Sequence, residues 1–104
     1  MTDVIRGFSF TRMVQSFANR DTEQLFHEER NRRFSAFARV ALRKLIQLNQ
    51  AGKLGDMAVP PGNRLKALQG ERRGFHSVRI NDQWRITFRW TVHGPAEVGI
   101  EDYH

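Results

Sequence analysis

The hydrophobic period of this chain changes once, and that change constrains its fold more than any other feature. Before Pro60-Pro61-Gly62, apolar residues recur at helical spacing, and after it they alternate with polar residues. Proline lacks a backbone donor and fixes its own φ, so this tripeptide ends any helix and separates the two halves. The sequence therefore predicts an α+β domain, with two N-terminal helices packed on a small, mainly antiparallel sheet.

Two helices are predicted in the first half. Asp21 and Gln24 have the spacing of a capping box for a helix that runs to near Glu29. The second helix has an apolar stripe at intervals of four, three, four and three residues, and Gly52 follows as its stop signal. The stripe consists of Phe34, Ala38, Ala41, Leu45 and Leu48. The basic residues beside it, Arg39, Arg43 and Lys44, are predicted to form a solvated or partner-facing surface.

Alternating residues in the second half predict antiparallel strands with one buried face each. The apolar positions are Val78 and Ile80, then Trp84, Ile86, Phe88 and Trp90, then Val98 and Ile100. Turns are predicted at Asn81–Gln83 and at His93–Pro95.

Register then assigns the opposite face of the sheet. Arg85, Thr87 and Arg89 share it with Ser77 and Arg79 of the neighbouring strand. Two interpretations of this face stay open. It is either an ordinary solvated sheet surface or a platform for a phosphate backbone, with a base stacked beside Phe75.

Composition restricts the class of protein. A chain of 104 residues has room for one domain, and the absence of cysteine excludes disulfides and thiolate metal sites. Nothing in the sequence demands an oxidising compartment, and no apolar stretch approaches the roughly 20 residues of a membrane span, so we expect a soluble, cytoplasmic protein. The formal charge of +6 comes from 14 arginines and three lysines against 11 acidic residues. It is concentrated in residues 30–44 and 64–90, which suits an RNA partner but equally fits unspecific attraction of polyanions.

Three motifs together resemble one family. They are Pro60-Pro61-Gly62-Asn63-Arg64-Leu65, the run from Ser77 through Asn81-Asp82-Gln83-Trp84-Arg85, and the ending Asp102-Tyr103-His104. This combination closely resembles the HigB toxins of the RelE/ParE superfamily, over roughly residues 13–104. The resemblance implies a RelE-like fold and a metal-independent endoribonuclease that cuts messenger RNA on the 70S ribosome. It also implies neutralisation by a helix-turn-helix antitoxin of HigA type, in a toxin–antitoxin heterotetramer.

The resemblance also assigns candidate catalytic residues. Asp102 and His104 become the proton-transfer candidates, and Tyr103 becomes a substrate-positioning or auxiliary group. By themselves these three residues would be read as a frayed terminus. Arg85 matches the arginine that stabilises the transition state in the family, and its alternative is a solvated strand arginine. Which residue is the general acid and which is the base stays open.

Six further basic residues are candidates for RNA binding: Arg64, Lys66, Arg72, Arg73, Arg79 and Arg89. Arg79 has the alternative of pairing with Asp82 or Glu101, and Arg72 and Arg73 have the alternative of a merely charged hairpin tip. Some HigB toxins carry a histidine and a lysine where this chain has Lys66 and Gln69, which puts the identity of the general base in doubt.

No metal or other cofactor is expected, because the four histidines, His27, His76, His93 and His104, are too far apart for a zinc motif.

The resemblance begins at Met13, because Met13–Phe17 has the pattern of the family's opening strand. Residues 1–12 are therefore interpreted as an extension that is either not native or disordered, or else an arm that packs on the domain. Two other functions stay open for the whole chain. One is a ParE-like toxin that acts on DNA gyrase without nuclease activity, and the other is an inactive module that binds RNA or antitoxin.

Overall fold

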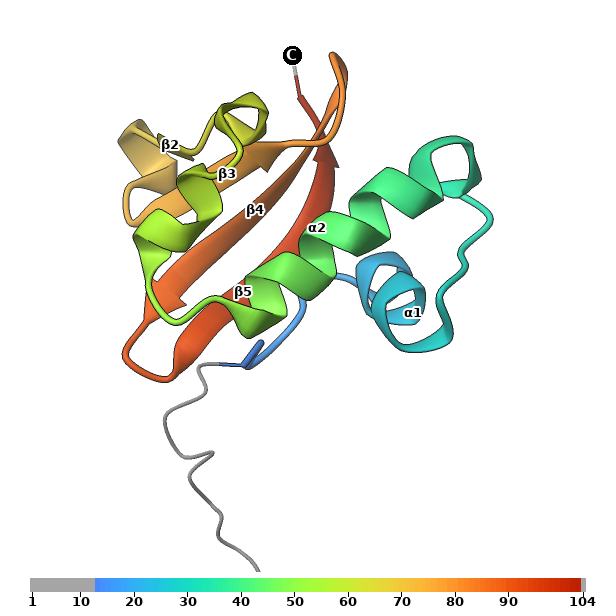
Figure 1. The fold of residues 1–104 in the computed structure, drawn as a ribbon, viewed down its shortest axis with the longest axis horizontal. Helices are drawn as coiled ribbons and strands as arrows, with labels where there is room; N and C mark the ends of the chain where they lie inside the picture. The colour runs from blue at the N-terminus through green and yellow to red at the C-terminus, as the bar shows by residue number, and fades with distance from the viewer. Residues whose placement is uncertain (1–12, 104) are drawn as a thin grey trace, which may run out of the picture.

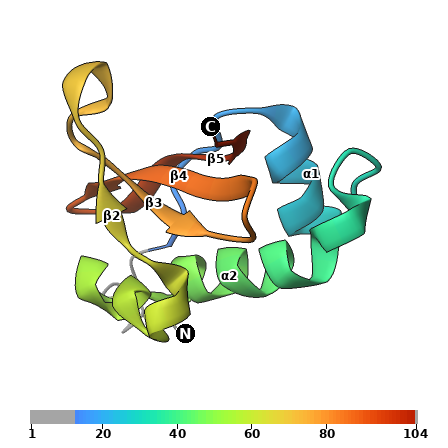
Figure 2. The same cartoon turned by 90° about the horizontal axis from the view of Figure 1, so that it is seen from above.

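The structure, a computed structural model, describes residues 13–103. In these residues a four-stranded antiparallel sheet has two α-helices packed against it (Figures 1 and 2). The sheet order is β2-β3-β4-β5, with β2 at Lys66–Ala67, β3 at Phe75–Arg79, β4 at Trp84–Thr91 and β5 at Gly94–Asp102. The helices are α1, Arg20–Glu28, and α2, Ala38–Gln50. The predicted α+β class is confirmed. In the described part of the chain, no helix has the length and apolarity needed to cross a membrane.

The first helix begins at a different cap from the predicted one. Asn19 is the N-cap residue, and its Oδ1 accepts a hydrogen bond of 2.8 Å from the backbone N–H of Thr22. Asp21 lies inside the first turn, and its carboxylate accepts a hydrogen bond from Asn31 at 3.0 Å. Gln24 accepts from the same amide at 2.7 Å. The predicted capping box is therefore wrong, because both side chains hold the loop after α1 instead of the start of the helix.

The second helix carries the predicted apolar stripe into the core, except that Phe34, although buried, lies before the helix and next to a short 3₁₀ turn at Ser35–Phe37. Ala41, Leu45 and Leu48 are fully buried and belong to one cluster with Val78 and Ile86 of the sheet. Figure 2 shows α2 running along one face of the sheet. This arrangement removes apolar side chains of both halves from water, which is the main favourable contribution to folding.

One basic residue of α2 does not lie in solvent as predicted. The Nζ of Lys44 donates a hydrogen bond to the backbone carbonyl of Arg79 and so ties the helix to the end of β3. Burial lowers the pKa of Lys44, and the neighbouring Arg43 lowers it further. Arg39 and Arg43 are exposed, as predicted.

The predicted turn between β3 and β4 is present. Asn81 Oδ1 accepts hydrogen bonds from the backbone N–H groups of Gln83, at 2.9 Å, and Trp84, at 2.8 Å. The next turn is at residues 92–93, whereas Gly94 and Pro95 already belong to β5. The prediction was displaced because proline was interpreted as a turn residue, although an edge strand also tolerates it.

Residues before α1 run parallel to the edge strand β5. Gln15 N–H donates to the carbonyl of Pro95 at 2.8 Å, and Ala18 N–H donates to the carbonyl of Val98 at 2.8 Å. The predicted opening strand thus forms a short parallel pairing at Phe17. Gly99 allows this close approach, since an added Cβ would lie 2.9 Å from the Cβ of Ala18. The predicted extension at residues 1–12 lies outside the described residues.

Candidate active site

The sheet face opposite α2 is polar, and it is buried at its centre. Cross-strand pairs Arg79–Arg85 and Ser77–Thr87 confirm that these residues share one face. Ser77, Arg85 and Thr87 are, however, only 0%, 7% and 3% exposed. The interpretation of this face as an ordinary solvated sheet surface is therefore wrong at its centre, because the loop before β2 and the C-terminal segment both contact Arg85.

Arg85 is a buried cation held by neutral oxygen atoms. Its Nε donates to Ser77 Oγ at 2.8 Å, and its Nη2 donates to the backbone carbonyl of Arg64 at 2.8 Å. No carboxylate among residues 13–103 forms an ion pair with it. Burial lowers the pKa of Arg85; Tyr103 opposes this shift, and the neighbouring Arg79 adds to it. A buried charge without a counter-ion costs free energy, so an anion that reaches this guanidinium is favoured there.

A buried asparagine positions the loop that contacts Arg85. Asn63 donates from Nδ2 to the carbonyls of Met57, at 3.1 Å, and Val59, at 3.2 Å. The next residue, Arg64, has the left-handed φ of 48° at the end of this loop, and its carbonyl accepts from Arg85. The sequence assigned no role to Asn63, although its position in the Pro-Pro-Gly-Asn motif was a usable signal.

The turn between β3 and β4 also holds the C-terminal segment. The carbonyl of Gln83 accepts from the N–H of Tyr103 at 2.6 Å, and Gln83 Nε2 donates to Asp102 Oδ2 at 3.1 Å. The Asn-Asp-Gln-Trp-Arg motif therefore supplies both the arginine of the site and the anchor for the tail. Gln83 was not predicted as a site residue, and its signal was the same motif.

Tyr103 contacts two of the other predicted site residues. Lys66 Nζ donates to its hydroxyl at 2.8 Å, and the Arg85 Cζ lies 5.2 Å from the centre of its ring. The hydrogen bond from Lys66 lowers the pKa of Tyr103, and the charges of Lys66 and Arg85 act in the same direction. His104 lies outside the described residues, so its role stays a prediction.

The other candidate arginines have partners or are exposed. Arg79 pairs with Asp82, as one of its alternatives stated, while Arg72 pairs with Glu101 at 2.8 Å and Arg89 pairs with Glu97 at 3.3 Å. Arg72 and Arg89 also lie 5.0 and 4.6 Å from the ring centre of Phe75. Arg64 and Arg73 are exposed. The structure thus brings Arg85, Lys66 and Tyr103 together and places Arg72 and Arg89 in a neighbouring cluster with their own carboxylates.

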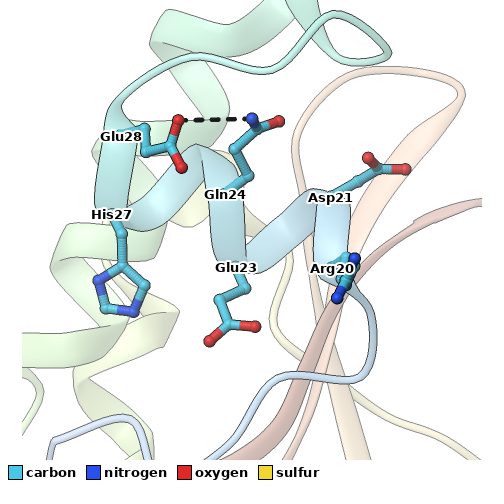
Figure 3. A pocket seen from close by; sticks show the side chains of 6 residues that line it. All are labelled: Arg20, Asp21, Glu23, Gln24, His27 and Glu28. Atoms are coloured by element: carbon cyan, nitrogen blue, oxygen red, sulfur yellow. Dashed lines mark hydrogen bonds between the residues drawn. The ribbon is translucent and has the colours of Figure 1, made fainter.

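A hollow on α1 is separate from this cluster (Figure 3). Its lining residues, Arg20, Asp21, Glu23, Gln24, His27 and Glu28, all belong to that one helix. Gln24 donates to Glu28 across it at 3.4 Å. Within residues 13–103, no three His, Asp or Glu side chains are grouped to hold a metal ion.

Comparisons with known proteins agree with the motifs. Residues 15–104 match the family described as RelE-like toxin of type II toxin-antitoxin system HigB. Toxin HigB-1 of Vibrio cholerae serotype O1 is 34% identical over 80 residues, which are 75% of this chain and 84% of that protein. Endoribonuclease HigB of Proteus vulgaris is 27% identical over 99 residues, which are 88% of this chain and 100% of that protein. This chain therefore belongs to the HigB family of RelE-like toxins of type II toxin–antitoxin systems, which implies an antitoxin as its partner.

Proposed function

We propose that this toxin is a metal-independent endoribonuclease that cuts messenger RNA on the 70S ribosome and so inhibits translation. The observation that carries the proposal is Arg85, a buried guanidinium without a carboxylate partner among residues 13–103, in contact with a tyrosine of lowered pKa. The name of the Proteus vulgaris relative, Endoribonuclease HigB, supports the same reaction. A HigA-type helix-turn-helix antitoxin neutralises the toxin in the cytoplasm, in a heterotetramer.

The reaction needs charge stabilisation at the scissile phosphate. The 2′-oxygen attacks phosphorus, the bond to the 5′-oxygen breaks, and a 2′,3′-cyclic phosphate forms. Negative charge grows on the phosphate oxygens in the transition state, and fixed donors are effective there. Ser77 and the Arg64 carbonyl fix the Arg85 guanidinium through Nε and Nη2. The Nη1 N–H groups, which form no hydrogen bond with residues 13–103, are left to bind the phosphate.

Two protons must move in the same step. A base takes the proton of the 2′-hydroxyl, and an acid gives a proton to the departing 5′-oxygen. Asp102 and His104 are the proposed pair. Tyr103 assists them, because Lys66 and Arg85 stabilise its phenolate form and make its hydroxyl a stronger acid. Lys66 therefore acts on Tyr103 as well as on RNA.

Substrate binding depends on charge and on the ribosome. Arg64, Lys66 and Arg73 are exposed and are proposed to contact phosphates. Arg72, Arg79 and Arg89 could join them only by giving up their carboxylate partners. Because few acid–base groups are present, positioning of the RNA by the ribosome must supply much of the rate.

Single-turnover cleavage of a defined messenger RNA on programmed 70S ribosomes tests the proposal. Arg85→Lys should lower the rate about 10²–10³-fold, because a point charge does not replace the oriented fork. His104→Ala should lower it about 10²–10⁴-fold, the usual weight of acid–base catalysis. Arg39→Gln, an exposed arginine of α2, is the matched control and should change it little.

A separate control tests whether the 2′-hydroxyl is the nucleophile in the cleavage step. Replacing the 2′-hydroxyl at the cut site by hydrogen should abolish cleavage, and the upstream product should end in a 2′,3′-cyclic phosphate. Products that end in a 3′-hydroxyl, or undiminished cleavage of the 2′-deoxy RNA, would contradict the proposed reaction. An absence of all cleavage by folded, antitoxin-free toxin would favour the gyrase-type or inactive alternatives.

A further inference from the structure

Glu101 lies directly opposite Arg85 in the sheet, but the two side chains form no ion pair. The β4–β5 register places Glu101 across from Arg85. Residues opposite each other in antiparallel strands have Cβ atoms about 4.5–5.5 Å apart, and opposite charges at that spacing normally attract. Yet no hydrogen bond or ion pair within residues 13–103 joins these two side chains.

The carboxylate of Glu101 is turned toward other donors. Arg72 donates to both of its oxygens, at 3.1 Å from Nη1 and 2.8 Å from Nη2, and Thr87 Oγ1 donates to Oε2 at 2.7 Å. Such bidentate, charge-assisted contacts are the stronger class of hydrogen bonds. The guanidinium of Arg72 in turn lies 5.0 Å from the ring centre of Phe75, which limits its movement.

We propose that Arg72 and Thr87 hold Glu101 away from Arg85, so that the phosphate site is not occupied by the protein's own carboxylate. The proposal rests on the proposed role of Arg85 in binding the scissile phosphate. Arg72 and Glu101 are then positioning residues rather than RNA contacts. Without Arg72, Glu101 would compete with the substrate phosphate, and as a group on the same domain it would do so at high effective concentration.

The pKa values of Arg72 and Glu101 shift in the directions expected for an ion pair. The hydrogen bond from Arg72 lowers the pKa of Glu101, and the same bond raises the pKa of Arg72. Glu101 is therefore ionised at neutral pH, where it is a potential competitor for Arg85.

Four proteins separate this role from a simple RNA contact: the wild type, Arg72→Gln, Arg39→Gln and the double variant Arg72→Gln/Glu101→Gln. Arg39→Gln is the control, because it removes the same charge from an exposed residue of α2. On ribosomes, Arg72→Gln should lower single-turnover cleavage on the order of ten-fold, as coupled neighbours do, and the double variant should recover the wild-type rate. Arg39→Gln should stay close to the wild type. A double variant as slow as Arg72→Gln, or an equal loss in Arg39→Gln, would overturn the proposal.

Binding of inorganic phosphate to the free toxin provides a measurement that does not depend on cleavage. The Arg85 Nε–H resonance is followed by NMR during a phosphate titration. Its phosphate-dependent shift should be weakened in Arg72→Gln and regained in the double variant. If wild-type toxin cuts no RNA but this order of binding holds, only the proposed function fails. If Arg72→Gln binds phosphate as the wild type does, the positioning role is wrong.

Discussion

The two faces of β4 are both buried at the centre of the strand, but they contribute to the protein in opposite ways. Ile86, on the face toward α2, is fully buried in the apolar cluster. Its neighbour Arg85, on the other face, is 7% exposed and is surrounded by hydroxyl and carbonyl oxygens. Burial of apolar surface stabilises the fold, whereas burial of an unpaired charge costs free energy. The comparison indicates that the helix-covered face maintains the structure while the opposite face holds a charge ready for a ligand.

The sharpest test of this comparison places one substitution on each face. Ile86→Ala should lower the free energy of unfolding by about 2–5 kcal/mol, because it leaves a cavity in the core. Arg85→Met should change it by less than about 1 kcal/mol, since three lost hydrogen bonds are offset by removal of a buried charge. Urea denaturation of both variants measures the difference. Equal losses would mean that Arg85 acts mainly as a structural cross-link.

A second test concerns the edge of the same sheet. Gly99→Ala should destabilise the protein by about 1–3 kcal/mol, as overpacking typically does, because the new Cβ lies 2.9 Å from Ala18 Cβ. Gly55→Ala is the matched control, since a Cβ at Gly55 meets no atom within 4 Å. Thermal unfolding should show a clear decrease in Tm for the first variant alone. The same Tm in both variants would mean that the segment before α1 moves aside without cost.

The apolar face could be predicted from sequence because its signals are local. The stripe with Ala41, Leu45 and Leu48 depends only on helical spacing, and the Asn81 turn depends on side-chain bonds two and three residues away. The N-cap of α1 was predicted wrongly because the deciding contact is not local. Asn19 and Asp21 are both suitable N-cap residues, and the hydrogen bond from Asn31, ten residues away, engages Asp21 elsewhere.

For the polar face, the sequence predicted which residues lie on it but not that they are buried. The strand register placed Arg85 and Ser77 on the same face. The burial of Arg85, however, depends on the carbonyl of Arg64, 21 residues away, and on Tyr103 near the C-terminus. Lys44 likewise finds its acceptor 35 residues away. No local pattern encodes such contacts. The motifs that carried the family resemblance did mark them, because Asn63 and Gln83 position the segments that reach Arg85 and Tyr103.

The smallest expected effect concerns the pH dependence of the Arg72–Glu101 pair. The folded-state pKa of Glu101 lies below its ordinary value of 4.5, chiefly through the hydrogen bond from Arg72. A lowered acidic pKa adds stability that is complete above the unfolded-state value and is lost as pH falls through the folded-state value. Both side chains are more than a third exposed, so the pair should contribute only about 0.2–1 kcal/mol. Wild type should therefore exceed Glu101→Gln in unfolding free energy at pH 6, and the two should converge below pH 4.5. A difference that persists unchanged in acid would assign the stability to the shape of the glutamate rather than to its charge. It would then leave the polar face without an energetic reason to keep Glu101 paired with Arg72.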